Sequence, residues 1–195
     1  LRQAFLAGAN LSRARMDKAK LAGAFLRGAN LYQTRLSGAS LEGALVGRTA
    51  TGQVAPAAAD MSAADLRSAN LNGASMIGVR LREARLDGAT LQGTDLTQAD
   101  LSWASASGSE LNGVSFAAAM LYGIVLDGAD MTAANLTMVR AAGTSFVEAK
   151  LSEATLVRAD LTFADFRNAD LDGADLSGAR LDGATGLNPD MQVSQ

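Results

Sequence analysis

The chain has 195 residues and a net charge of −3, is 48% hydrophobic but only 5% aromatic, and contains neither cysteine nor histidine. Disulfides and thiolate metal sites are therefore excluded, and the commonest general base and transition-metal ligand are missing, so we expect no cofactor, no metal ion and no enzyme activity. No apolar run approaches the ~18 residues that a membrane-spanning helix needs, so we expect no membrane partner.

Residues 1–46 repeat with a period of five. Leu1, Leu6 and Leu11 open a series of central apolar positions, and a small residue, first Ala4, stands two positions before each following one. Five residues advance an α-helix by about 500°, which spreads successive leucines about 140° apart, and in a strand they would alternate between faces. A chain that turns by a fixed angle every five residues can bury all of them, as short-period solenoids do.

The segment 47–60, "GRTATGQVAPAAAD", is the weakest part of the pattern. Its central positions are Thr51 and Pro56, and Val54 replaces a small residue, yet Met61 resumes the series on schedule. We interpret the segment as a degenerate coil with one side bulged outward. A recognition loop and a disordered stretch are the alternatives.

From Met61 the period continues without a slip to Leu181. The complete series has 37 central positions, of which 25 are Leu, four Met, three Phe and one Val, and 27 of the 37 small positions are Ala. Leu and Ala therefore supply most of the core, which we expect to be narrow and regular.

Residues 186–195, "GLNPDMQVSQ", leave the repeat. Pro189 cannot continue a hydrogen-bonded ladder, so we expect a C-terminal tail, or a short cap in which Leu187 covers the last coil. At the other end the sequence opens without Met and without a visible signal peptide, which suggests a trimmed segment of a longer chain.

The repeat resembles that of the pentapeptide repeat family, usually summarised A(D/N)LXX. The matching segments include "ANLSR" at 9–13, "ADLRS" at 64–68, "ADLTF" at 159–163 and "ADLSG" at 174–178. The resemblance implies an all-β fold, a right-handed quadrilateral parallel β-helix with four pentapeptides per coil. Residues 1–185 would then form about nine coils and a rod roughly 43 Å long, at ~4.8 Å per coil.

Two groups of apolar side chains fall at outward positions of such a coil. Contiguous exposed apolar surface often marks an interface, and Tyr and Trp are enriched in binding hot spots. Gly123 and Gly143 would leave an open shelf beside the second group. We therefore predict protein interfaces at Phe5, Phe25 and Leu45, and at Trp103, Met120, Tyr122 and Phe163.

Charge is graded along the chain, with +5 over residues 1–60, −2 over 61–120 and −6 over 121–195. Residues 20 apart would stack, which predicts weak exposed ion pairs along one row that nearly alternates in sign: Asp60, Arg80, Asp100, Met120, Arg140, Asp160 and Arg180. Near the acidic end, four carboxylates would ring one coil: Asp160, Asp165, Asp170 and Asp175.

These features favour a non-catalytic scaffold or protein–protein interaction module, one that could belong to a longer bacterial protein and whose protein partner is unknown. The alternative, which the resemblance implies, is a DNA mimic that binds a type II topoisomerase such as gyrase. The acidic ring supports this alternative and the basic first third opposes it, because a mimic needs dense negative charge along the rod.

Other partners follow from the same features. We expect no direct nucleic-acid binding, because the basic end lacks an aromatic stacking platform. Homo-oligomerisation through the coil ends is a further hypothesis, since one end of the rod is basic and the other acidic. The absence of cysteine fits a cytoplasmic location.

Overall fold

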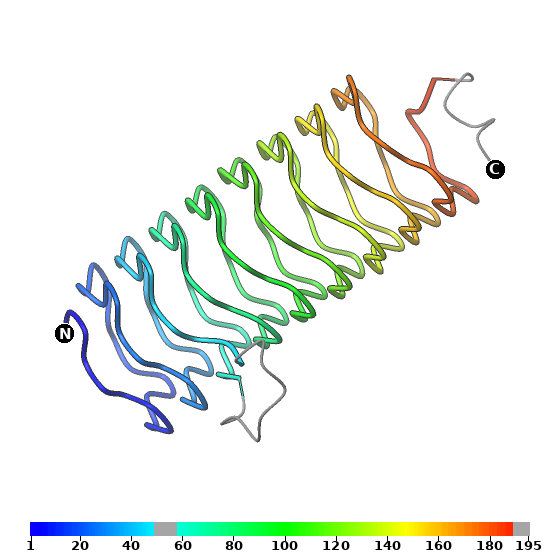
Figure 1. Cartoon of the computed structure of the whole chain (residues 1–195). Helices are drawn as coiled ribbons and strands as arrows, with labels where there is room; N and C mark the ends of the chain where they lie inside the picture. Colours follow the sequence, from blue (N-terminus) through cyan, green and yellow to red (C-terminus); the bar gives the residue numbers. More distant parts are fainter. Residues whose placement is uncertain (49–57, 189–195) are drawn as a thin grey trace.

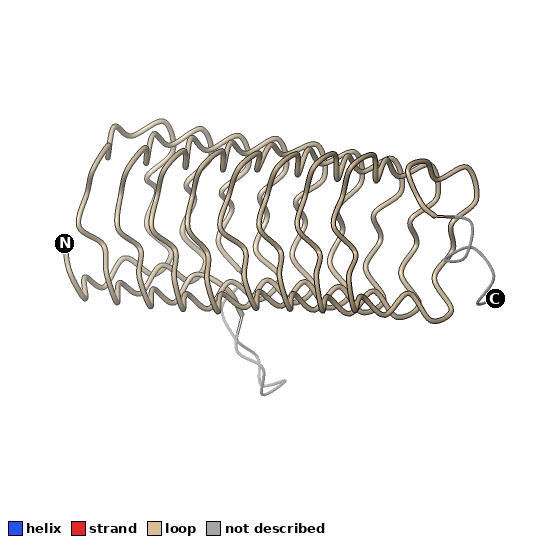
Figure 2. Ribbon diagram, turned by 90° about the horizontal axis from the view of Figure 1, so that it is seen from above, coloured by secondary structure: helices blue, strands red, loops and turns tan. Residues whose placement is uncertain are grey.

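The computed structural model of the chain describes residues 1–48 and 58–188. These residues contain no helix, and the backbone winds into a rod of stacked coils that begins with residue 1 at one end (Figure 1). Adjacent coils meet through single-residue parallel bridges instead of longer strands, so the ribbon is drawn as loop throughout (Figure 2). The fold is a right-handed quadrilateral parallel β-helix, which confirms the prediction from the repeat.

The bridges join residues 20 apart along most of the chain, which fixes each coil at four pentapeptides. Four columns of bridged residues run along the rod, one on each side. The first column contains nine residues, one for each coil: Phe5, Phe25, Leu45, Ser75, Asp95, Ser115, Asn135, Thr155 and Asp175. At ~4.8 Å between bridged neighbours, this column is about 38 Å long.

Each pentapeptide closes a turn at a corner of the coil. The N–H of the small residue donates to the carbonyl of the central residue three positions earlier, as from Ala9 to Leu6 at 3.0 Å. An Asp or Asn at the bridged position accepts a further bond from the N–H two residues on, as Asp60 does from Ser62 at 3.0 Å. In all but the pentapeptides next to residues 49–57, the described residue two positions after the centre has a positive φ, which explains the frequent Gly there.

Central and small residues fill the inside of the rod. The described central residues between 21 and 166 are at most 3% exposed. Phe146 and Phe166 stack inside with ring centroids 4.9 Å apart. Where a hydroxyl replaces an inward Ala, it donates to a main-chain carbonyl, as Thr144 does to Leu121 at 2.8 Å. The core of the described coils is therefore apolar, with its few polar groups hydrogen-bonded.

The bridge register changes once. Four consecutive bridges, beginning with Asn30 to Asp60, join residues 30 apart instead of 20. The coil still closes there, because the Ala59 N–H donates to the Val46 carbonyl at 3.1 Å. The interpretation of this segment as a bulged coil, and its two alternatives, concern residues 49–57, which lie outside the described part of the chain.

The C-terminal end of the described chain turns back onto the last coils. Gly186 lies so close to the backbone of Arg167 that a Cβ would not fit. Leu187 is partly buried against the core. Residues 189–195, including Pro189, lie outside the described part.

Candidate functional site

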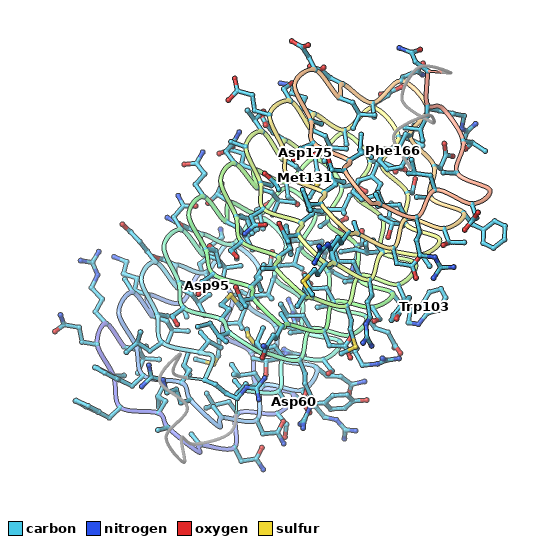
Figure 3. The ribbon with its side chains drawn as sticks, turned by 45° about the vertical axis from the view of Figure 1, so that its right-hand side comes forward. Asp60, Asp95, Trp103, Met131, Phe166 and Asp175 are labelled. Atoms are coloured by element: carbon cyan, nitrogen blue, oxygen red, sulfur yellow. The ribbon has the colours of Figure 1, made fainter. Side chains whose placement is uncertain are left out.

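One side of the rod gathers aromatic and methionine side chains, which we call the aromatic face: Trp103, Met120, Tyr122, Met138 and Phe163. Trp103 is 62% exposed, Phe163 72% and Met138 54%, whereas Met120 and Tyr122 are half-buried. Trp103 lies at the edge of the rod, in contrast to the buried Phe166 (Figure 3). Because residues 20 apart stack, Trp103 and Phe163 lie three coils apart, about 14 Å.

Both exposed aromatic rings lie across a glycine of the next coil. Trp103 and Phe163 have φ values of 64° and 58° at a turn position that glycine often fills. A Cβ on Gly123 would overlap the Trp103 ring, and one on Gly183 would overlap the Phe163 ring. A Cβ on Gly143 would meet nothing within 4 Å. The predicted open shelf is therefore wrong for Gly123, which the indole covers, and holds for Gly143.

Arg140 lies in the middle of the aromatic face, bridged to Met120 on one side and Asp160 on the other. The alternating row predicts an ion pair between Arg140 and Asp160, but this pair does not form. The Asp160 carboxylate lies 3.6 Å from Arg180 and accepts a hydrogen bond from the Thr162 hydroxyl, and this bond lowers the pKa of Asp160. Among the described residues, the exposed Arg140 side chain therefore has no ion-pair partner.

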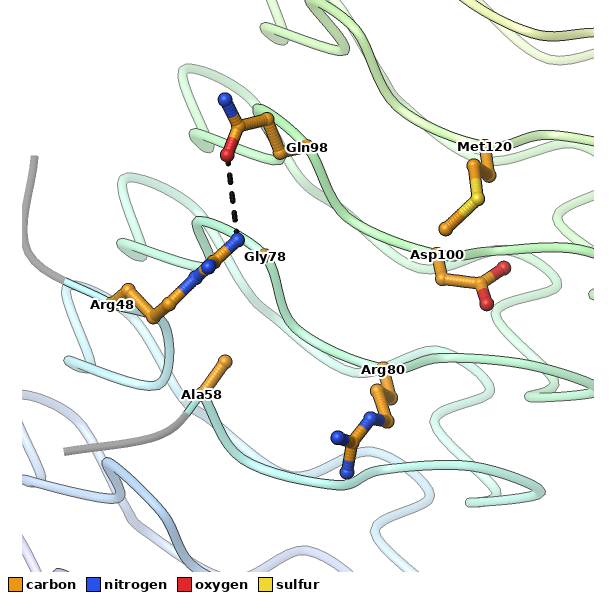
Figure 4. Close-up of a pocket in the computed structure, with 7 residues that line it drawn as sticks. All are labelled: Arg48, Ala58, Gly78, Arg80, Gln98, Asp100 and Met120. Atoms are coloured by element: carbon orange, nitrogen blue, oxygen red, sulfur yellow. Dashed lines mark hydrogen bonds between the residues drawn. The ribbon is translucent and has the colours of Figure 1, made fainter.

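A shallow hollow of about 410 Å³ adjoins the aromatic face and shares Met120 with it. The Arg48 guanidinium lies against Gly78, where a Cβ would overlap it, and donates to Gln98 Oε1 at 3.3 Å (Figure 4). The remaining lining residues are Ala58, Arg80 and Asp100. The hollow offers a polar margin to the face.

The other predicted apolar interface, near the start of the chain, is a stacked column. Phe5 bridges Phe25, which bridges Leu45, and the two phenyl rings stack with centroids 4.6 Å apart. Phe5 is 83% exposed, whereas Phe25 and Leu45 are half-buried. The next residue in the column is Ser75, so the stripe ends after three coils. Phe5 therefore leaves most of its surface in water at the end of the rod, whereas Phe25 and Leu45 are partly covered by their neighbours in the column.

The four carboxylates of the predicted acidic ring occupy the four bridge columns in succession: Asp160, Asp165, Asp170 and Asp175. Hydrogen bonds from Arg167 hold the pKa of Asp165 at about 2, and the Asp165–Arg167 ion pair measures 2.7 Å. Hydrogen bonds from backbone N–H groups and hydroxyls also lower the pKa of the other three carboxyls. All four are ionised at neutral pH, and arginines pair with two of them.

The five-residue pattern does not distinguish Met138 from other outward residues, and the row of alternating charge predicts an ion pair for Arg140. Both belong to the row 138–143, which the 20-residue register stacks on 118–123 beside Tyr122. The sequence signal for both residues is the composition of neighbouring rows across the face, which single columns do not contain.

Two further classes of site can be assessed within residues 1–48 and 58–188. No group of three or more Asp or Glu residues there is placed to hold a metal ion. No helix in this part of the chain could span a bilayer.

The family model for pentapeptide repeats matches the chain with eight copies, and the matched stretches are residues 1–31, 9–45, 59–98, 99–137, 109–146 and 144–183. No curated protein sequence matches this chain. Among solved structures, the chain is similar to QnrB1, a plasmid-mediated fluoroquinolone resistance protein, with a TM-score of 0.73 and 19% identity over 98% of this chain and 95% of QnrB1. At this identity the likeness shows a shared fold.

A second similar structure is HetL, a pentapeptide repeat protein involved in heterocyst differentiation regulation from the cyanobacterium Nostoc sp. strain PCC 7120. Its TM-score is 0.45 at 28% identity, over 93% of this chain and 89% of HetL.

Proposed function

We propose that this chain, which belongs to the pentapeptide repeat family, is a non-catalytic interaction module and that its aromatic face binds a protein partner. The observation that carries the proposal is the exposure of Trp103 and Phe163 on one side of a rod whose core is filled. Neither histidine nor cysteine is present to support the commonest nucleophilic or acid–base chemistry.

The composition of the face also supports protein binding. Trp, Tyr, Met and Arg are enriched in the cores of protein interfaces, and truncation of a few such residues removes most of the binding energy. The aromatic face brings all four residue types together within four coils.

Photo-crosslinking tests the proposal. Benzoylphenylalanine replaces Phe163 in one variant and Gln92, an exposed residue on another side of the rod, in a control variant. In lysate of the source cells, we expect a defined protein adduct from position 163 only, and its loss when Trp103→Gly is added. No adduct from position 163, or the same adducts from both positions, would contradict the proposal.

A DNA mimic that binds gyrase is the second candidate. The shared fold with QnrB1 and the ionised acidic ring support it. The ion pairs of Asp160 and Asp165 with arginines, and the +5 balance of residues 1–60, weaken it. A DNA-supercoiling assay with purified gyrase, with and without a fluoroquinolone, tests whether the chain inhibits gyrase or protects it from the drug. No inhibition and no protection at micromolar protein would remove this candidate.

A further inference from the structure

We infer that the protein segment bound by the aromatic face carries a carboxylate that pairs with Arg140, beside apolar side chains that contact Trp103 and Phe163. The inference depends on the proposed function of the face and adds the chemistry of its partner.

The first argument is the isolation of Arg140. Its column neighbour Asp160 is engaged by Arg180 and Thr162, and its other neighbour is Met120. A partner that covers the face removes water from the guanidinium, and a desolvated charge without a counter-charge is costly. A carboxylate matches the planar fork of arginine with two parallel hydrogen bonds, so it is the group that best compensates this loss.

The second argument is the charge around Arg140. Arg158 lies one coil beyond Met138, is exposed, and forms no ion pair with any described residue. The acidic side chains of the face are already paired, as Asp100 is with Arg82 at 3.3 Å. Glu83, one coil before Trp103, is three coils or about 14 Å from the row of Arg140. The centre of the face therefore presents two free positive charges.

The spacing of the face sets the pattern of the partner segment. Measured along the rod axis, Arg140 lies about two coils (~10 Å) beyond Trp103 and one coil (~5 Å) before Phe163. An extended segment rises ~3.3 Å per residue, so the carboxylate falls about three positions after the first apolar residue, and the second apolar residue one or two positions after the carboxylate. A segment of about five residues spans the face.

Protein is a better match than nucleic acid. Aromatic rings beside arginine can stack bases, but single-strand binding also needs a basic groove that follows the phosphates. Here the two free arginines stand among Asp100, Asp160 and Asp182, and the whole chain carries a net charge of −3. The carboxylates of Asp100, Asp160 and Asp182 interrupt the basic groove that a phosphate backbone would follow.

Peptide selection followed by titration tests the inference. A phage library of random 12-residue peptides is selected on the immobilised chain and, in parallel, on its Trp103→Gly variant. Peptides that require Trp103 are synthesised, and binding is followed through the emission of Trp103, the single tryptophan. We expect selected peptides to contain Asp or Glu at the stated spacing from apolar residues.

Arg140→Met then tests the pairing directly, since it keeps an unbranched apolar stem and removes the charge. We expect at least tenfold weaker binding of the selected peptides, and the same loss on the native chain when the peptide acid becomes an amide. The two losses should not add in the double combination. Arg85→Met, an exposed arginine in a different column, is the matched control and should bind as the native chain does.

The outcomes separate the two proposals. Peptides that need Trp103 but lack an acid, or that bind Arg140→Met unchanged, overturn the inference and leave the proposed function standing. If no selected peptide depends on Trp103, the proposed function fails and the inference fails with it. If oligo(dT) quenches Trp103 at low micromolar concentration and no peptide does, the partner is a nucleic acid and both proposals are overturned.

Discussion

Gly123→Ala tests how the indole of Trp103 is held on the rod. A Cβ at position 123 would overlap the ring, so the ring must move away from the coil. Gly143→Ala is the matched control, because residue 143 lies in the next coil of the same corner, has a φ of 69°, and has no atom within 4 Å of its Cβ position. The two variants share the backbone cost and differ in the contact with the ring.

The magnitudes follow from the structure. An alanine in the left-handed region costs ~1 kcal/mol relative to glycine, which both variants should lose. Trp103 is 62% exposed, so about two-fifths of its surface is covered. For a side chain of ~250 Å² this is ~100 Å², and losing half of it at ~25 cal/mol per Å² costs ~1 kcal/mol more. We expect Gly123→Ala to lose ~2 kcal/mol and Gly143→Ala ~1 kcal/mol of unfolding free energy.

Urea unfolding monitored by circular dichroism measures these losses, and tryptophan emission reports the ring itself. Gly123→Ala should shift the emission of Trp103 to longer wavelength and increase its quenching by iodide, whereas Gly143→Ala should leave both unchanged. Equal destabilisation of the two variants with identical emission spectra would refute the placement of the indole on Gly123.

Three further predictions concern the core and the turns. Phe166→Ala should cost ~3–5 kcal/mol in urea unfolding, because it removes a buried ring stacked on Phe146; a loss below ~1 kcal/mol would contradict this packing. Thr144→Val should cost ~0.5–1.5 kcal/mol, since it removes the hydroxyl that donates to the Leu121 carbonyl, and a more stable variant would argue against that bond. The pKa of Asp165 is about 2 in the folded chain, below its ordinary value of 3.8, so its contribution to stability is complete above pH ~4 and is lost as the pH falls towards 2. Thermal unfolding should therefore show a smaller acid-induced loss for Asp165→Asn than for the native chain, and identical pH profiles would exclude this contribution.

The fold could be predicted from the sequence because every coil repeats the same local solution. An inward Leu and an inward Ala recur every five residues with few exceptions, and an Asp or Asn bonds its own turn in many of the pentapeptides, so the pattern of one coil predicts the next. The register change near Val46 could not be predicted in the same way. It adds ten residues between bridged neighbours, and ten is a multiple of five, so the phase of the pattern is unchanged.

The aromatic face could be predicted only in part. The 20-residue register placed Trp103, Tyr122 and Phe163 on one side, because stacking follows directly from coil length. It did not predict which glycine the indole covers, or which carboxylate each arginine chooses. Those choices depend on side-chain rotamers and on competition among neighbours in adjacent coils.

The sequence by itself determined which residues line the core, because a chain that turns every five residues can bury all of them. The coil length of 20 residues, and with it the order of residues along each side of the rod, followed from the resemblance to pentapeptide repeats. Only the tertiary structure decided that Asp160 pairs with Arg180 and leaves Arg140 free. Both pairings lie one coil away and are equally allowed by the register. The difference between them arises from the three-dimensional positions of the charged groups and of the hydroxyl of Thr162.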